Sequence, residues 1–246
     1  MQNIGLIIPC YNEEKRLPKE AFDTFLSSNE AKNITFFFID DGSTDNTKTI
    51  LQKLADLNPN NVKTLFFLQN NGKAEAVRKG VLHANNENQF EYIGFLDADL
   101  SCPLNQLKLF ITYIESAQNE KIIFGSRILK FGSKIKRNSK RHYLGRVFST
   151  VANSVVKIPV YDSQCGAKFF HKSYIKTLFN QPFKSKWIFD LELILRVRNQ
   201  VGIEKCNEIF YELPLNEWNE IGGSKIKFTD FLKIPNELIK INRHYN

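Results

Sequence analysis

Four short apolar runs, separated by helical patterns, constrain the fold of this chain more than any other feature of its sequence. The runs are IGLIIP at 4–9, ITFFFID at 34–40, KTLFFL at 63–68 and YIGFLD at 92–97. They are apolar nearly throughout, as expected of strands that are covered on both faces. Strands that alternate with helices predict an α/β fold of βαβ units, with an open, mostly parallel sheet and helices on both faces.

The segments between the runs carry the helical patterns. After Ser43, which we take as the helix N-cap, apolar residues recur at the spacing of one helix face, at Ile50, Leu51, Leu54 and Leu57. Similar patterns follow Gly72 and Pro103. A fifth strand is predicted at IIFGSR, 122–127. We therefore expect one domain over 1–246.

The charge balance predicts an anionic partner. The chain has 246 residues, a formal net charge of +8 and a sequence pI of about 9.2. Such a surplus fits nucleic acid, a phosphorylated ligand or anionic lipid, and does not choose between them.

The cysteines and the apolar runs bear on the compartment. Cys10, Cys102, Cys165 and Cys206 are far apart and form no Cys-x-x-Cys motif, which favours a reducing compartment. The start, MQNIGLIIPCYNEE, has no basic region before its apolar run, so it is not predicted to be a signal peptide. No apolar stretch is long enough to span a bilayer. We expect a cytoplasmic protein that meets a membrane only at its cytoplasmic face.

Polar and acidic residues follow each predicted strand of the first half. They are PCYNEE, DDGSTDNT, QNNGKAEA and DADLS. In open parallel sheets, ligands bind beyond the carboxyl ends of the strands. The sequence therefore predicts an acidic rim on one edge of the sheet, formed by Glu13, Asp40, Asp41, Asp97 and Asp99.

The Asp97-x-Asp99 pair is the strongest chemical signal of this rim. Two like charges at the end of a buried strand repel each other, and a bound cation would offset that repulsion. Carboxylate oxygens are hard ligands that suit Mg²⁺ or Mn²⁺, and Mg²⁺ commonly shares one or two of them with substrate phosphates. The alternative is a solvated loop with two surface aspartates. Neither a G-x-G-x-x-G motif nor a P-loop follows the first strand, so dinucleotide and P-loop sites are disfavoured.

The second half is basic and less regular. Residues 128–146, ILKFGSKIKRNSKRHYLGR, interleave Lys and Arg with Phe131, Ile135 and Tyr143. This segment is either a solvated loop or a contact with an acceptor or an anionic membrane surface. A helix is predicted to follow it through VFSTVANSVVKI, and an amphipathic tail at 228–243 is interrupted by Pro235.

The ordered motifs of the rim resemble those of the family 2 glycosyltransferases with the GT-A fold. The resemblance rests on PCYNEE, DDGSTDNT, NNGKAEAVRKG, DADLS and GSR. In the second half, DSQCGAKFF, WIFDLELI and EWNEIGGSK look like the polyprenyl-phosphate sugar transferases, above all the dolichyl-phosphate β-glucosyltransferases, with dolichyl-phosphate mannose synthases close by. The chain departs from the family pattern at Ala74, where Gly is common. From the sequence we also expect no N-terminal membrane anchor of the kind that the eukaryotic glucosyl branch carries.

The resemblance implies a nucleotide-sugar-binding half at 1–127, an acceptor-binding half at 128–246 and a role for each matching residue. The residues implied to bind the nucleotide sugar are Pro9, Tyr11, Asn12, Glu13, Asp41, Lys73, Asp97, Ser224 and Lys225. Asp97 and Asp99 are implied to hold Mg²⁺ or Mn²⁺, and the residues implied in catalysis are Asp99, Asp162, Asp190 and Arg127. Arg127 and Arg146 are implied to meet the acceptor phosphate. Gln164 and Glu192 are implied to frame the sugar side, and we expect only one of Asp190 and Glu192 to be functional.

The reaction that these roles imply is the inverting transfer of a hexose to a lipid phosphate. UDP-glucose is the preferred donor, and GDP-mannose is possible. A phosphate acceptor is already an anion at neutral pH, so it can attack the anomeric carbon without a general base. The nearest alternative is a sugar hydroxyl acceptor, which needs a base and would make Asp162 or Asp190 indispensable.

Two other classes of function remain open at this point. A nucleic-acid-binding protein is suggested only by the positive charge, because no binding motif is present and the acidic rim would repel phosphates. We expect no nucleic acid partner. A non-catalytic nucleotide-sugar binder is the other class, and the intact set of carboxylates argues against it.

Overall fold

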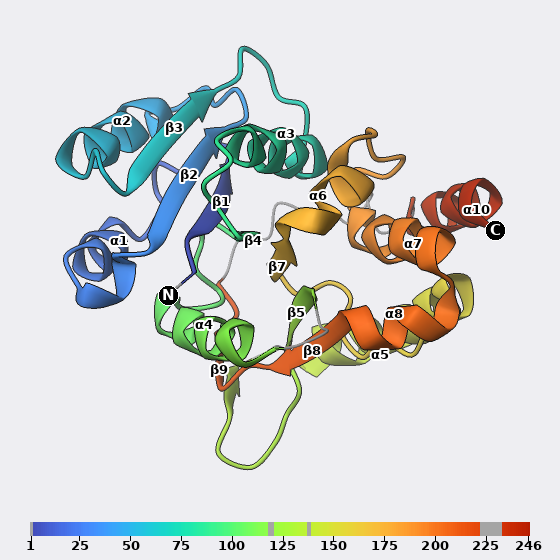
Figure 1. The fold of residues 1–246 in the computed structure, drawn as a ribbon. Coiled ribbons are helices and arrows are strands. Elements are labelled where there is room, and N and C mark those ends of the chain that lie inside the picture. Colours follow the sequence, from blue (N-terminus) through green and yellow to red (C-terminus); the bar gives the residue numbers. More distant parts are fainter. Residues whose placement is uncertain (1, 118–120, 137–138, 222–232) are drawn as a thin grey trace.

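The chain folds around one central sheet flanked by helices, as a computed structural model shows (Figure 1). The structure describes residues 2–117, 121–136, 139–221 and 233–246. The strands of this part of the chain are β1 (Ile4–Cys10), β2 (Ile34–Asp40), β3 (Val62–Phe66), β4 (Tyr92–Leu96), β5 (Ile122–Ser126), β6 (Lys134–Lys136), β7 (Ala167–His171), β8 (Phe210–Pro214) and β9 (Glu217–Asn219). Its α-helices are α1 (Lys19–Leu26), α2 (Thr47–Leu57), α3 (Lys73–Asn86), α4 (Leu107–Ser116), α5 (Ser139–Val156), α6 (Lys172–Phe179), α7 (Phe189–Val201), α8 (Ile203–Ile209) and α10 (Ile234–Tyr245).

The sheet is mixed, and its mostly parallel core agrees with the sequence prediction. Within the described residues its order is β3-β2-β1-β4-β7-β5-β8. The pairs β1–β2, β1–β4, β2–β3 and β5–β8 are parallel, whereas β7 runs antiparallel to both β4 and β5. Strand β7 from the second half of the chain thus lies between two strands of the first half. A small second sheet pairs β6 with β9 in parallel.

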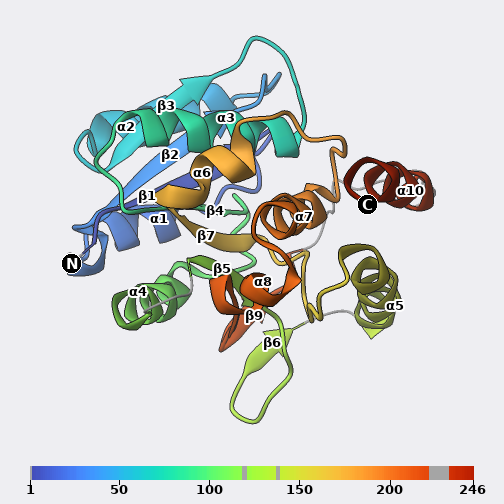
Figure 2. The ribbon, with the colours of Figure 1, turned by 45° about the vertical axis from the view of Figure 1, so that its right-hand side comes forward.

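Both faces of the sheet are buried because apolar side chains alternate between two cores. In β1, Ile7 points into the core under α3, whereas Leu6 and Ile8 point into the core under α1 and α2. In β2, Phe37 and Phe38 divide in the same way. The first core continues under α6 and α7, and Figure 2 shows these helices on the same side of the sheet as α3. This double burial explains why the strands lack alternating polar residues.

Three local expectations are corrected by the structure. Helix α2 begins at Thr47 with Asn46 as its N-cap, so Ser43 is not the cap. Helix α5 begins at Ser139, within the basic segment rather than after it. Pro235 does not interrupt the tail helix: it occupies the first turn of α10, where the missing N–H costs no hydrogen bond. Residues 228–232 of the predicted tail lie outside the described residues.

In the part of the chain that the structure describes, none of the helices combines the length and the apolar character needed to cross a membrane.

Candidate active site

One edge of the sheet collects the loops that the sequence analysis singled out. The strands β1, β2 and β4 are parallel, and β5 runs the same way because both β4 and β5 are antiparallel to β7. The carboxyl ends of these four strands therefore meet the start of β7 at a single edge. This topology places the segment 162–166 of the second half beside the ends of β4 and β5.

The loops after β1 and β2 are joined by hydrogen bonds. The Asn12 N–H donates to Ser43 Oγ at 2.9 Å, and the Thr44 N–H donates to Asn12 Oδ1 at 2.8 Å. Asn12 has φ +49°, a left-handed conformation that asparagine tolerates better than most residues. The Glu13 N–H donates to Thr47 Oγ1 at 2.7 Å, and Glu13 is buried. Ser43 therefore orients the first loop, and Pro9 and Tyr11 lie partly exposed beside it.

Asp41 is held by main-chain donors of the loop before α3. The N–H groups of Asn71 and Gly72 donate to its two carboxylate oxygens at 2.9 and 2.7 Å. Burial raises the pKa of Asp41, and the two N–H donors oppose that rise. The turn depends on Gly42, since it has φ +70° and a Cβ there would lie 2.5 Å from the Gln69 carbonyl carbon.

Asp97 lies between a lysine and a glycine. Its Oδ1 forms an ion pair with Lys73 Nζ at the start of α3. A Cβ on Gly166 would come within 2.1 Å of Asp97 Oδ2, so only glycine leaves room for the carboxylate. Burial alone would lower the pKa of Lys73, but the charges of Asp97 and Asp190 outweigh burial and raise it. Lys73 is therefore a cation at neutral pH.

Asp99 is held from two sides. Arg16 Nη2 lies 2.9 Å from Asp99 Oδ2, and the Ser101 N–H donates to Asp99 Oδ1 at 3.0 Å. Leu100 has φ +52°, and this left-handed turn carries the chain away directly after the carboxylate. The sequence analysis did not identify Arg16, although it lies three residues after Glu13 in the same loop.

The residues at this edge suit a hard divalent cation. Asp97 and Asp99 are neighbouring carboxylates, and each is neutralised by one side-chain cation of the protein. The cradle that Gly166 leaves around Asp97 would be filled by any larger residue. No group of three His, Cys, Asp or Glu side chains in the described ranges is arranged to hold a metal. Mg²⁺ nevertheless commonly binds to one or two carboxylates of the protein and completes its coordination with substrate phosphates.

Arg127 and Asp162, which were predicted separately, form one ion pair. Arg127 Nε and Nη2 each lie 2.6 Å from an oxygen of Asp162. The main-chain N–H of Arg127 also donates to Asp162 Oδ2 at 3.0 Å. Burial would lower the pKa of Arg127, but the charge of Asp162 raises it further. Glu212 of β8 accepts the N–H groups of Tyr161 and Asp162 at 2.7 and 2.8 Å. Asp162 is thus fixed through its side chain by Arg127 and through its main chain by Glu212.

Arg146 approaches the same segment from α5. Its guanidinium lies over the Tyr161 ring, 4.1 Å from the ring centroid, and Nη1 donates to the Tyr161 carbonyl at 3.2 Å. The side chain is partly exposed. Gln164 follows the segment, and its buried Nε2 has no hydrogen-bond partner among the described residues. Cys165 is fully buried, which raises the pKa of its thiol to about 12, so it is not a nucleophile at neutral pH.

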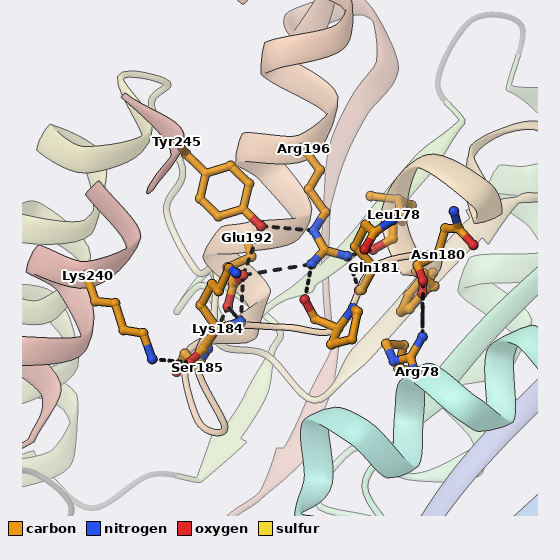
Figure 3. A network of polar contacts seen from close by, with 12 residues as sticks. Arg78, Leu178, Asn180, Gln181, Lys184, Ser185, Glu192, Arg196, Lys240 and Tyr245 are labelled. Carbon is orange, nitrogen blue, oxygen red and sulfur yellow. Dashed lines mark hydrogen bonds and ion pairs between the residues drawn. The ribbon is translucent and has the colours of Figure 1, made fainter. Parts of the chain in front are cut away.

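Asp190 and Glu192 lie in different surroundings. Asp190 Oδ1 is 2.6 Å from Nζ of Lys168, a fully buried lysine on β7. Glu192 instead accepts the N–H groups of Lys184 and Ser185 and the hydroxyl of Tyr245, at 2.8 to 3.0 Å. Figure 3 shows Glu192 at the centre of this network, with the 180–185 segment on one side and Tyr245 of α10 on the other. Glu192 thus joins α7 to the 180–185 segment and to α10, whereas Asp190 is paired with a lysine of the central sheet.

The remaining predicted residues, Ser224 and Lys225, lie outside the described residues. Sequence reasoning missed Arg16, Gly166 and Lys168. Lys168 had a visible signal, since it is a lone lysine within the apolar strand sequence GAKFF. Gly166 had none, because only the approach of Asp97 from another strand makes its missing side chain important.

This fold and this rim of paired carboxylates define a GT-A glycosyltransferase. The chain belongs to glycosyl transferase family 2, whose model matches residues 6–179. It is 33% identical to dolichyl-phosphate beta-glucosyltransferase ALG5A of Trichomonas vaginalis, over 97% of this chain and 72% of that protein. It is 30% identical to the dolichyl-phosphate beta-glucosyltransferase of Saccharomyces cerevisiae, over 98% of this chain and 75% of that protein.

A solved structure with the same fold is glucosyl-3-phosphoglycerate synthase from Mycobacterium tuberculosis in complex with Mn²⁺, UDP and phosphoglyceric acid. The TM-score is 0.68 at 12% identity, and the match covers 98% of this chain and 78% of that one. The same synthase with Mn²⁺, UDP-glucose and phosphoglyceric acid gives a TM-score of 0.65.

Proposed function

We propose that this protein transfers glucose from UDP-glucose to a polyprenyl phosphate such as dolichyl phosphate, with inversion at the anomeric carbon. Two kinds of similarity support the proposal. The names of the relatives at 30 to 33% identity give dolichyl phosphate as the acceptor and glucose as the sugar. The structural relative, which shares the fold, was crystallised with UDP-glucose and Mn²⁺.

The observation that carries the choice of acceptor is the pairing of both candidate bases with cations. Asp162 gives both oxygens to Arg127, and Asp190 is bound by the buried Lys168. A carboxylate held by a cation is a weaker proton acceptor, because the cation stabilises its ionised form. A sugar hydroxyl needs such a base, whereas a phosphate oxygen does not. The site therefore suits a phosphate acceptor better.

Each group of residues has a task in this proposal. Asn12, Glu13 and Asp41 line the nucleoside end of the donor site. Asp97 and Asp99 would hold Mg²⁺ or Mn²⁺, which would supply positive charge opposite the leaving diphosphate. Lys73 and Arg16 add positive charge at the same place. Ser224 and Lys225 stay assigned to the diphosphate by resemblance alone.

The acceptor phosphate meets the positive charge of Arg127 and Arg146. These two side chains contact the same short segment, Tyr161–Asp162: Arg127 directly follows β5, and Arg146 lies on α5. Bringing two anions together is the main electrostatic problem of this reaction, and fixed cations reduce it without reorganisation during the reaction. The attacking phosphate oxygen forms the new bond to the anomeric carbon as the bond to the UDP oxygen breaks.

A transfer assay separates the two acceptor classes. Labelled UDP-glucose is supplied with a polyprenyl phosphate or with a sugar acceptor, and GDP-mannose replaces the donor in a parallel series. We expect glucosyl lipid phosphate as the product. We also expect Asp162→Asn and Asp190→Asn to keep measurable turnover at saturating acceptor. Transfer to the sugar alone, abolished by either variant, would overturn the proposal in favour of the hydroxyl acceptor.

We place the protein peripherally at the cytoplasmic face of the membrane that carries the lipid phosphate, with the turn between β5 and β6 as the contact. Both views show this segment extending away from the body of the protein (Figures 1 and 2). Lys130–Ser133 form a tight turn: the Ser133 N–H and Oγ both donate to the Lys130 carbonyl, at 3.1 and 2.8 Å. The turn exposes Leu129 and Phe131, with exposed Lys130, Lys134 and Lys136 around them. Each lysine near an anionic surface contributes about 1 kcal/mol.

Vesicle sedimentation tests this contact. Phe131→Ser should weaken binding to vesicles that contain anionic lipid by roughly tenfold, because one large apolar side chain no longer inserts. Leu68→Ser is the matched control, since Leu68 is as exposed (103% against 108%) but lies in the loop after β3. Equal losses in the two variants, or no binding by the wild type, would remove the proposed membrane contact and leave the transfer chemistry untouched.

A further inference from the structure

Lys168 is a charged residue in a place where charges are rare. It lies on β7 in the middle of the sheet and its side chain is 0% exposed. The aromatic rings of Phe124 and Phe95 lie 4.6 and 5.4 Å from its Nζ. A buried cation requires compensation. Here the compensation is the Cys165 carbonyl and the Asp190 carboxylate, to which Nζ donates.

The two partners of Lys168 both belong to the candidate site. Cys165 precedes Gly166, the residue that leaves room for Asp97. Asp190 lies in the first turn of α7, and its charge helps to raise the pKa of Lys73, which is paired with Asp97. Lys168 is therefore paired with Asp190, and the charge of Asp190 acts in turn on Lys73, the partner of Asp97.

We propose that Lys168 is a positioning residue for glucosyl transfer: its ion pair fixes the Asp190 carboxylate in the first turn of α7. The inference rests on the proposed function only for the identity of the reaction. Without Lys168, a carboxylate that is buried at this depth favours its protonated form, because burial disfavours the charge. A protonated Asp190 no longer accepts a hydrogen bond from a substrate hydroxyl through that oxygen and no longer balances the charge of Lys73.

The test compares Lys168→Met with a matched ion pair outside the site. Lys63 Nζ lies 2.6 Å from Glu87 and over the Phe37 ring, so Lys63→Met removes a pair with the same separation at a partly exposed position. Lys168→Met with Asp190→Asn forms a neutral pair and keeps the fold measurable if the single variant unfolds. Thermal melting of all variants identifies those that are folded.

The decisive readout is the titration of Asp190 itself, followed by carboxyl ¹³C resonances in the free enzyme and assigned with Asp190→Asn. Lys168 contacts Asp190 directly, and the charge of Asp190 also acts on Lys73, which is paired with Asp97. We expect the titration midpoint of Asp190 to rise in Lys168→Met by about one pH unit or more, and to be unchanged in Lys63→Met. The same midpoint in wild type and Lys168→Met would overturn the proposal.

The pH dependence of turnover links this titration to catalysis. With donor and acceptor saturating, Lys168→Met should lose roughly tenfold in kcat at acidic pH and recover as pH rises through the new midpoint. A loss that is the same at every pH would show a merely structural role and overturn the proposal. If the wild type fails to glucosylate a lipid phosphate, the proposed function fails, while the titration still decides whether Lys168 is paired with Asp190.

Discussion

The two sides of the candidate site hold their carboxylates by different means. On the side of β1 and β2, Asp41 and Asp40 accept main-chain N–H groups of nearby turns. On the side of β5, β7 and α7, the side chains of Arg127 and Lys168 are the charged partners of Asp162 and Asp190, although Asp162 also accepts the main-chain N–H of Arg127. Asp97 and Asp99 lie between these regions: Asp97 is paired with the Lys73 side chain, and Asp99 has both Arg16 and the Ser101 N–H as partners.

The difference has consequences for mutation. A main-chain donor survives any substitution of its own residue except proline, so the first side should be sensitive mainly to changes of turn geometry. A side-chain cation can be removed, and the partner then becomes an uncompensated buried charge. The second side should therefore be more fragile toward single substitutions and more tolerant of paired ones.

The largest expected effect breaks the Arg127–Asp162 pair. Arg127→Met alone should destabilise the protein by about 3–5 kcal/mol, because Asp162 stays buried without its partner. The double variant Arg127→Met with Asp162→Asn should recover much of that loss. Urea unfolding of the four proteins of this cycle measures both values. If the two single effects simply add in the double variant, the two residues do not act as a pair.

The next effect concerns the region between the two sides. Asp99→Ala should weaken Mn²⁺-dependent binding of UDP roughly a hundredfold, since the carboxylate is a proposed metal ligand. Isothermal calorimetry with UDP and GDP, each with and without Mn²⁺, measures this and selects the base. Binding that is unchanged in the variant, or absent for both nucleotides in the wild type, would contradict the donor site.

A smaller effect separates Glu192 from Asp190. Glu192→Gln should destabilise the protein by about 2 kcal/mol, because hydrogen bonds to a buried charge are lost at the junction of α7, α10 and the 180–185 segment. The KM of the Glu192→Gln variant for the donor should stay close to the wild-type KM at temperatures where the variant is folded. Asp190→Asn should show the reverse, with altered kinetics and smaller destabilisation. A kinetic defect in a fully folded Glu192→Gln enzyme would reverse the assignment.

The smallest expected effect tests the side with main-chain donors. Burial raises the pKa of Asp41 above its ordinary value, so nucleotide binding that uses the ionised form is complete at neutral pH and declines as pH falls through the raised pKa. Asp41→Asn should bind UDP roughly tenfold more weakly at neutral pH and should lack this acid decline. Calorimetry over a pH series follows both. An identical acid decline in the variant would assign the titration to another group.

The first side of the site could be predicted from the sequence because its residues act close to where they stand in the chain. PCYNEE, DDGSTDNT and DADLS each follow a strand, and parallel strands bring their carboxyl ends to one edge. The basic segment at 128–146 was harder: its pattern did not reveal that α5 begins at Ser139. The tail prediction failed at Pro235 because the same residue breaks a helix in its interior and suits its first turn.

The sequence by itself determined the alternation of strands and helices, the buried sheet and the acidic rim, since these follow from local periodicity and from the direction of parallel strands. Only the tertiary structure decided which charges meet. Arg127 and Asp162 are 35 residues apart, and Arg16 and Asp99 are 83 apart. The insertion of β7 between β4 and β5 places Gly166 against Asp97 and brings Lys168 to Asp190. Such partners are selected by distance in the folded chain, and a linear pattern of residues does not contain that distance.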